Sequence, residues 1–226
     1  MFHDPYLIKT VEYLTGVAFL LLFIPFWRYT AVPMLAPAAA KAKAVWSGDF
    51  AEWFRMPERL FYHPGHAWLR PDADGFVTLG VDDFAQQLVG PVSALSLPDP
   101  GMKVDRGKKA WSLNVDGREI PMLSPVSGVI ADINDKALTD PGIVNDDPYG
   151  LGWLVRVKPP SQEATDDLLT GDAARRWMHA VSGDLVAAMN PAMGQLAQDG
   201  GMPIHGLARG LDEEHWDDVA RRFLLS

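Results

Sequence analysis

The chain has 226 residues, a formal net charge of −9 and 48% hydrophobic residues, so it can bury a core in one domain and still carry appendages. It has no cysteine, which excludes disulfides, thiolate-bound zinc, iron–sulfur clusters and a cysteine nucleophile on this chain. The acidic balance argues against nucleic acid as a partner, because nucleic acid binding needs a basic face.

Residues 1–30 are predicted to form a transmembrane anchor. The run YLTGVAFLLLFIPFW (13–27) carries no charge, and with its flanks it is about as long as the hydrocarbon core is thick. A cleavable signal peptide is the rival interpretation, since APAAAKA (36–42) offers small residues, but Asp4 and Glu12 weaken a basic leader. The residues expected at the membrane interface are Tyr6, Tyr13, Trp27, Arg28 and Tyr29.

The charges around this run predict its orientation. More basic residues follow it than precede it, so the positive-inside rule favours a single-pass protein of the inner (cytoplasmic) membrane with its bulk in the cytoplasm. Residues 31–59 are predicted to be a linker and a juxtamembrane amphipathic segment. The first part is rich in alanine and proline, and DFAEWFRMPERLFY (49–62) is predicted to be a short amphipathic helix. That helix lies either on the bilayer or against its own domain.

Residues 60–160 are predicted to form a domain of short strands. Runs rich in β-branched and apolar residues alternate with Gly, Pro, Asp and Asn, as in a small barrel or sandwich. DDFAQQLVG (82–90) interrupts them as a short helix, with Asp82 as its N-cap. The expected strands are 75–81, 92–98, 108–115, 119–125, 128–133 and 152–159.

Residues 161–226 are predicted to be a C-terminal helical extension. One or two helices are expected before Pro191, followed by a glycine-rich loop at 199–206. LDEEHWDDVARRFLL (211–225) has acids in its first turn and arginines near its end, which agrees with the helix dipole.

Residues 61–159 resemble the H protein of the glycine cleavage system. Both YHPGHAWLRPDADGFVTLGVDDFAQQLVG and SPVSGVIADINDKALTDPGIVNDDPYGLGWLVRVKP follow that family. The most specific matches are Asn145, Asp147, Pro148, Tyr149, Gly150, Gly152, Trp153 and Leu154. The resemblance implies a lipoyl-type hybrid barrel-sandwich of antiparallel strands. The expected fold class is therefore α+β, with an N-terminal transmembrane helix, this sandwich, and a C-terminal helical extension.

The resemblance also implies a lysine that carries lipoic acid at a hairpin tip, ten residues after a glycine and eight before the proline of a Pro-x-x-Gly. Gly107 and Pro125 supply both landmarks, and both counts arrive at Gly117. There is no lysine between Lys109 and Lys136.

The hairpin tip is thus predicted to be a degenerate lipoyl position. Asp116-Gly117 is a strong signal for a two-residue turn, because glycine tolerates positive φ. Arg118 cannot replace the lysine, since its guanidinium stays protonated and forms no amide. No bound cofactor is expected.

Other candidate chemistry is predicted to be structural, and neither catalytic nor metal-binding residues are expected. His63 and His66 lack further ligands at a recognisable spacing. Four carboxylate pairs are interpreted as caps, turns or solvated helix faces: Asp82/Asp83, Asp146/Asp147, Asp166/Asp167 and Asp217/Asp218.

The preferred functional prediction is a non-enzymatic, single-span accessory subunit that docks on integral membrane proteins of a respiratory or photosynthetic electron-transfer complex. The reactive lysine is absent, and the additions resemble contact surfaces. The alternative is a group carrier, or a partner of a lipoate-dependent enzyme, in glycine cleavage-type metabolism. A third possibility is a tethered regulator that binds a small ligand in its C-terminal helical region.

Overall fold

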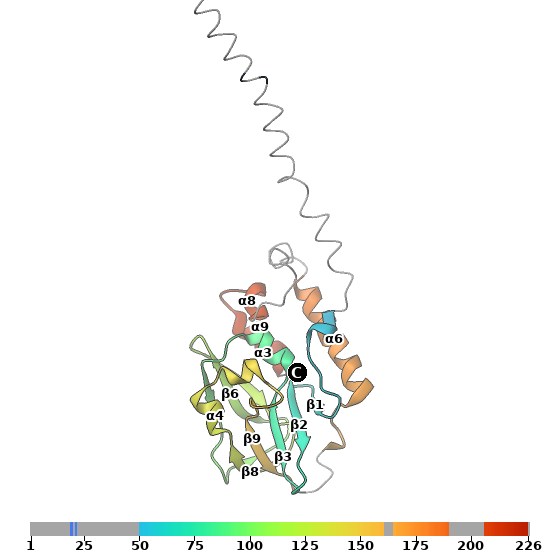
Figure 1. Cartoon of the computed structure of the whole chain (residues 1–226), viewed down its shortest axis with the longest axis vertical. Coiled ribbons are helices and arrows are strands. Elements are labelled where there is room, and N and C mark those ends of the chain that lie inside the picture. The colour runs from blue at the N-terminus through green and yellow to red at the C-terminus, as the bar shows by residue number, and fades with distance from the viewer. Residues whose placement is uncertain (1–18, 20, 22–49, 161–164, 190–205, 226) are drawn as a thin grey trace, which may run out of the picture. The chain divides into compact units, whose positions relative to one another are not determined.

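The computed structural model describes residues 19, 21, 50–160, 165–189 and 206–225 (Figure 1). The chain divides into Met1–Ser47 and Gly48–Ser226, and the second unit holds every strand described below. Apart from Phe19 and Leu21, the predicted anchor lies outside the described residues, as do its interface residues Tyr6, Tyr13, Trp27, Arg28 and Tyr29. Among the helices that the structure does describe, none has the length and apolar character needed to cross a membrane.

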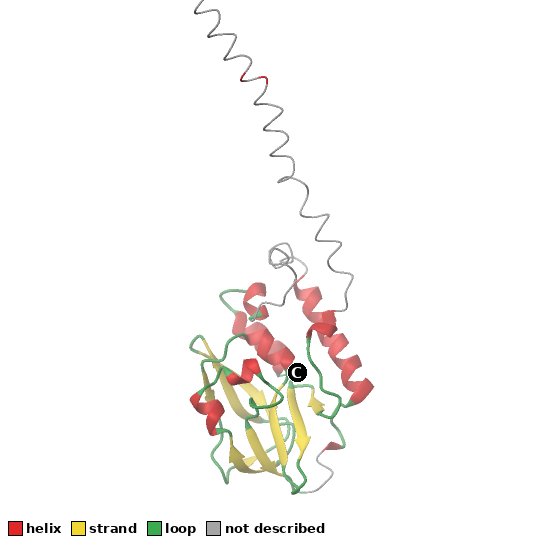
Figure 2. Cartoon of the chain, in the orientation of Figure 1, coloured by secondary structure: helices red, strands yellow, loops and turns green. Residues whose placement is uncertain are grey.

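Two antiparallel sheets form the body of the second unit (Figure 2). The larger sheet has the strand order β1-β2-β3-β9-β8-β5, and the smaller one has the order β4-β6-β7. In chain order the strands are β1 (Phe61–His63), β2 (Ala67–Pro71), β3 (Val77–Val81), β4 (Ala94–Ser96), β5 (Lys103–Val104), β6 (Lys109–Val115), β7 (Arg118–Leu123), β8 (Gly128–Ile133) and β9 (Val155–Lys158).

The helices α3, α8 and α9 lie together at one end of these sheets (Figure 1). A short 3₁₀ turn, η2 (Phe50–Trp53), packs against α6. The helices are α3 (Asp83–Val89), α4 (Asp135–Thr139), α5 (Ile143–Asp146), α6 (Gly171–Met189), α8 (Leu207–Leu211) and α9 (Trp216–Leu224). Every residue of α3 is buried, because α5, α8 and α9 surround it.

The core is built from strands β2, β3 and β6, in which at least three consecutive residues are buried, and from one close contact between β2 and β3. Trp68, Leu79 and Leu113 are fully buried, and each side chain of this size contributes about 1.5–3 kcal/mol when it leaves water. Gly80 lies directly against the Trp68 ring, where a Cβ atom would come within 2.7 Å. The indole N–H of Trp68 donates to the carbonyl oxygen of Pro148 at 2.9 Å, which ties β2 to the loop before β9.

The predicted α+β class is confirmed for the antiparallel sandwich and the C-terminal helices. The six predicted strands correspond to β3, β4, β6, β7, β8 and β9, and the predicted helix over 82–90 is α3 with Asp82 as its N-cap. The strands β1, β2 and β5 were not anticipated. Of the described residues 50–62, only η2 is helical, and Phe61 and Tyr62 belong to β1, which pairs with β2.

The C-terminal region differs in detail from its prediction. One long helix, α6, occupies residues 171–189 as expected. The predicted helix over 211–225 begins only at Trp216, and the separate short helix α8 precedes it. The predicted loop at 199–206 lies outside the described residues except for Gly206.

Candidate functional site

The β6–β7 hairpin ends in a two-residue turn formed by Asp116 and Gly117. Val115 and Arg118 are the last paired residues, and the two between them have φ values of 47° and 75°. Positive φ at both positions defines the type I′ turn whose twist matches that of paired strands. A Cβ atom on Gly117 would have no neighbour within 4 Å, so the apex of the turn is open.

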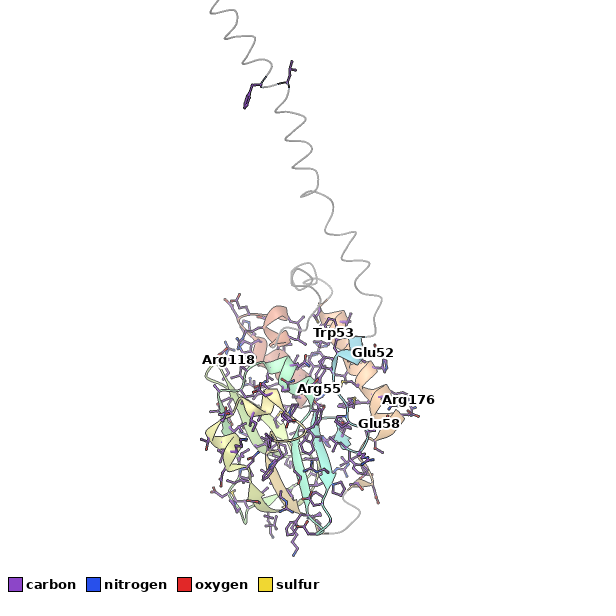
Figure 3. The ribbon with its side chains drawn as sticks, in the orientation of Figure 1. Glu52, Trp53, Arg55, Glu58, Arg118 and Arg176 are labelled. Atoms are coloured by element: carbon purple, nitrogen blue, oxygen red, sulfur yellow. The ribbon has the colours of Figure 1, made fainter. Side chains whose placement is uncertain are left out.

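Arg118, the first residue after the turn, is held by the C-terminal helices. Its Nη1 forms an ion pair with Asp217, and its Nη2 donates to the carbonyl oxygen of Glu214 at 2.7 Å. The guanidinium also lies 5.9 Å from the ring centre of Trp216. The labelled Arg118 stands beside α8 and α9 in Figure 3. A residue adjacent to the turn is therefore fixed by a segment about one hundred positions away.

Asp116, on the other side of Gly117, is held by the same segment. Its carboxylate forms an ion pair with Arg209 in α8. The Arg209 guanidinium in turn lies 4.9 Å from the ring centre of Trp216, a second cation–π contact on that indole. Trp216 is buried, so the two arginines and one indole form a compact cluster beside the turn.

Helix α9 also covers the free edge of β7. Arg221 Nη2 donates to the carbonyl oxygen of Glu119 at 3.1 Å, which pairs an edge-strand group that would otherwise face water. Arg221 Nη1 reaches Asp217 at 2.9 Å. Desolvation acts to raise the pKa of Asp217, but the hydrogen bond and charge of Arg118 and the charge of Arg221 outweigh it. The pKa of this carboxyl lies below its usual range.

The family-specific string at residues 145–154 is a structural connector. Asn145 accepts from the Val92 N–H at 2.9 Å and donates to the Gly90 carbonyl at 3.0 Å. A Cβ atom on Gly152 would meet the Ile143 and Asp147 carbonyl oxygens at 2.7 Å, so only glycine fits there. The residues of this string that match the family therefore have packing and hydrogen-bonding roles.

A buried polar network surrounds the N-terminus of α3. Asp82 accepts from the Ala85 N–H at 2.8 Å as N-cap, and its other oxygen lies 2.9 Å from Nδ1 of His66. The His66 ring stacks on Phe84 at 4.3 Å between centres and contacts Trp177 of α6 at 4.8 Å. Both polar partners are fully buried, so this pair joins α3 to β2 and α6.

Asp83 extends this network to the segment before β1. It accepts from the Arg55 N–H at 2.8 Å and from the side-chain amides of Gln86 and Gln87 at 2.8 and 2.9 Å. The hydroxyl of Tyr149 accepts from the Asp83 N–H at 2.9 Å and donates to the Arg55 carbonyl. Burial and the nearby Asp82 charge raise the pKa of Tyr149 well above its usual value, so this hydroxyl stays a donor.

The histidine pair does not converge on one point. His63 Nδ1 accepts from the Gly65 N–H at 2.9 Å, whereas His66 faces Asp82. Within the described ranges no group of three or more His, Asp or Glu side chains could hold a metal ion. Burial lowers the pKa of His63, helped by the charges of Arg106 and His66.

The carboxylate pairs have mainly the structural roles expected of them. Asp82 caps α3, Asp147 accepts from the Leu151 N–H at 2.8 Å, and Asp167 pairs with Arg106 at 2.7 Å. Asp83 departs from the expectation of a cap or solvated face, because it is fully buried and satisfied by four donors. Asp217 also departs from it, because it is buried and pairs with Arg118 and Arg221.

Sequence reasoning located the turn but missed the residues that surround it. Arg209, Trp216 and Asp217 lie in a stretch interpreted only as a helical extension. The sequence signal for these residues was a tryptophan, Trp216, placed among acidic residues and arginines. A single sequence does not show which hairpin such a cluster contacts.

The fold and this hairpin define a class, namely an antiparallel sandwich whose β6–β7 hairpin ends in a tight turn with an open apex. The glycine cleavage H-protein family model matches residues 60–181, and the chain belongs to this family. The glycine cleavage system H protein of Marinobacter nauticus is 37% identical over 127 residues, which are 56% of this chain and 96% of that protein. The H protein of Coxiella burnetii is 32% identical over 127 residues, covering 56% and 98%.

A crystal structure of a glycine cleavage system H protein from Mycobacterium marinum is also similar. It shares 30% sequence identity with a TM-score of 0.47, and the match covers 52% of this chain and 94% of that one.

These comparisons correct the preferred functional prediction. An accessory subunit of a respiratory or photosynthetic electron-transfer complex is wrong, because the family model and the relatives are those of glycine cleavage H proteins. The predicted inner-membrane location, the lipid bilayer and the integral membrane partners are wrong for the same reason. The comparisons favour the alternative in glycine cleavage-type metabolism.

Proposed function

We propose that this chain is a non-catalytic partner protein in lipoate-dependent, glycine cleavage-type metabolism. It presents an H-protein-like surface to an enzyme of that system without carrying lipoate at the β6–β7 turn. The domain that does this is residues 60–160, and residues 161–226 form a helical extension of it.

One observation carries the proposal: a glycine stands at the open apex of an intact hairpin in a chain of this family. The hairpin has paired strands up to a two-residue turn, so the backbone at this position is intact. The amine that would accept a lipoyl group is missing there, and no lysine follows Lys109 until Lys136. A family member of this kind retains a surface for recognition but has no arm for transfer at this turn.

Intact-mass analysis tests the missing arm. The full chain is incubated with lipoate, ATP and a lipoate ligase, with the Marinobacter nauticus H protein as the positive control. We expect the control to gain a lipoyl mass and this chain to gain none. A lipoyl increment on any lysine of this chain would instead support the group-carrier function.

A competition assay tests the partner role. The chain is added to a glycine-decarboxylating enzyme that is using a lipoylated H protein as its substrate. If the two proteins share a docking surface, the apparent KM for the H protein rises while kcat stays constant. An unchanged KM at a large excess of this chain would refute the proposal.

A further inference from the structure

We infer that the C-terminal latch, which we define as residues 206–225, closes both flanks of the β6–β7 turn to enzymes that would grip the hairpin. The turn would then resist lipoylation even with a lysine at its apex. This inference deepens the proposed function and rests on it for the identity of the excluded enzyme class, the enzymes that attach lipoate.

The contacts lie on both sides of one residue. Asp116 is paired with Arg209 of the latch, and Arg118 is paired with Asp217 and with the Glu214 carbonyl. Gly117 between them makes no such contact. An enzyme that reads the residues flanking a target lysine would find both of them already engaged.

The apolar face of the latch keeps it docked. Leu207, Trp216 and Leu224 are buried, and Phe223 lies 6.0 Å from Phe84 between ring centres. The Gly206 N–H also donates to the carbonyl oxygen of Gln87 at 2.8 Å. Burial of several large side chains outweighs the loss of one surface ion pair. The ion pairs therefore close the latch over the flanks of the turn, while the apolar contacts anchor the latch on α3.

The open apex should be accessible to a small reagent but not to an enzyme that must surround the turn. A small molecule approaches the Gly117 position from solvent without touching the latch, because a Cβ atom there would have no neighbour within 4 Å. A ligase must bring the carboxyl of ATP-activated lipoate to the lysine amine, with amide formation and release of AMP. Its surface must therefore surround the turn, where Arg209 and Trp216 stand.

The test introduces an amine at the apex and then loosens the latch. Gly117→Lys is made in the full chain, alone and together with Arg209→Met and Asp217→Asn, which remove latch charges but leave its apolar face. Each protein is incubated with lipoate, ATP and lipoate ligase, and lipoyl incorporation is followed by intact mass. We expect little incorporation with the latch intact and at least about a fivefold faster rate with it loosened, as for the loss of the two ion pairs that join the latch to the turn.

Two controls test whether the change in lipoylation rate is specific to the latch. Arg175→Met with Gly117→Lys removes an exposed arginine of α6 that pairs with Glu58 and Asp172, away from the hairpin, and should not raise the rate. Gly117→Cys should react with a maleimide equally fast with and without the latch substitutions, which shows that the apex itself is open in each fold.

Equal lipoylation of Gly117→Lys with the latch intact or loosened would overturn the inference, whether both rates are high or both are near zero. That result would leave the proposed function standing, because the natural chain has glycine there. Conversely, failure of the competition assay would refute the proposed function without changing how the latch affects this hairpin.

Discussion

Two regions of the molecule pair carboxylates with cationic or polar donors, one in the buried interior and the other near the surface. Around α3, Asp82 and Asp83 are fully buried and accept hydrogen bonds from neighbouring donors. At the β6–β7 turn, the Asp116 side chain is 63% exposed and Arg118 is 41% exposed. Burial decides what each kind of pair does: a desolvated pair left incomplete is costly, whereas an exposed one mainly fixes geometry.

The two regions meet through α3. Its first turn holds the buried network, and its other contacts reach α8 and α9 of the latch. Gln87 shows the connection, because its side chain donates to Asp83 while its carbonyl accepts from Gly206. The network should therefore determine stability, and the turn should determine access.

The largest effect is expected from Asp82→Ala. The substitution removes the N-cap of α3 and leaves His66 buried without its partner, at a combined cost of about 3 kcal/mol in the free energy of unfolding. Urea denaturation followed by circular dichroism measures the change. Asp135→Ala, an exposed aspartate in the first turn of α4, is the matched control and should stay within about 0.5 kcal/mol. Equal losses in both variants would contradict this contrast between the two regions.

Tyr149→Phe should have a smaller effect on the same network. It removes the hydroxyl that accepts from the Asp83 N–H and donates to the Arg55 carbonyl, while keeping the ring that faces Trp68. The N–H of the buried Asp83 and the carbonyl of the exposed Arg55 lose a partner, so the free energy of unfolding should fall by about 2 kcal/mol, mostly from the Asp83 N–H. Chemical denaturation provides the value, and a neutral result would mean that water replaces the hydroxyl.

Arg209→Met should show how little the turn contributes to stability. We expect a loss below about 1 kcal/mol, because both ion-pair partners are more than one-third exposed. The loss should shrink further in about 1 M salt, where exposed charges are screened. Urea titrations at low and high salt measure both effects. A loss as large as that of Asp82→Ala would show that the turn and the network do not differ as proposed.

Much of the fold could be predicted because its signals are local. Asp116-Gly117 demands positive φ, and the short apolar runs around it alternate as strands do. Asp82 before α3 is a local cap signal that the structure confirms. The strand β1 was missed although its partner β2 is adjacent in the chain, because it has only three residues; the bridge from Tyr62 to Leu169, across more than one hundred residues, is not visible in any local pattern.

The site was predictable only in part for the same reason. Counting from Gly107 and Pro125 found the apex, since these landmarks lie just before β6 and just after β7, within ten residues of it. The pairing of Arg118 with Asp217 joins residues 99 positions apart. Nothing in either local stretch indicates that α9 returns to cover β7. The membrane-subunit prediction was wrong because it inferred function from what was added and what was missing, and gave too little weight to the fold that was kept.

The smallest effect concerns His63, at the edge of the buried region. Burial first, then the charges of Arg106 and His66, hold its pKa below the ordinary value of 6.5, and its Nδ1 accepts from the Gly65 N–H. The unfolded chain therefore binds a proton more readily than the folded one. The contribution of His63 to stability is complete above the unfolded pKa and is lost as pH falls through the folded pKa.

The lowered pKa of His63 predicts that the free energy of unfolding depends on pH differently in the wild-type chain and in His63→Asn. The asparagine amide oxygen can accept the same N–H but does not titrate. From about pH 8 to about pH 5, the free energy of unfolding should fall more steeply for the wild type than for the variant. Urea denaturation at each pH measures the slopes, and proton NMR of the His63 ring gives its pKa directly. A ring pKa of 6.5 would abolish the predicted slope difference, and a higher one would reverse it. Either value would also mean that water reaches His63 more than its contacts indicate. His63 would then behave like the solvent-exposed turn and not like the buried network.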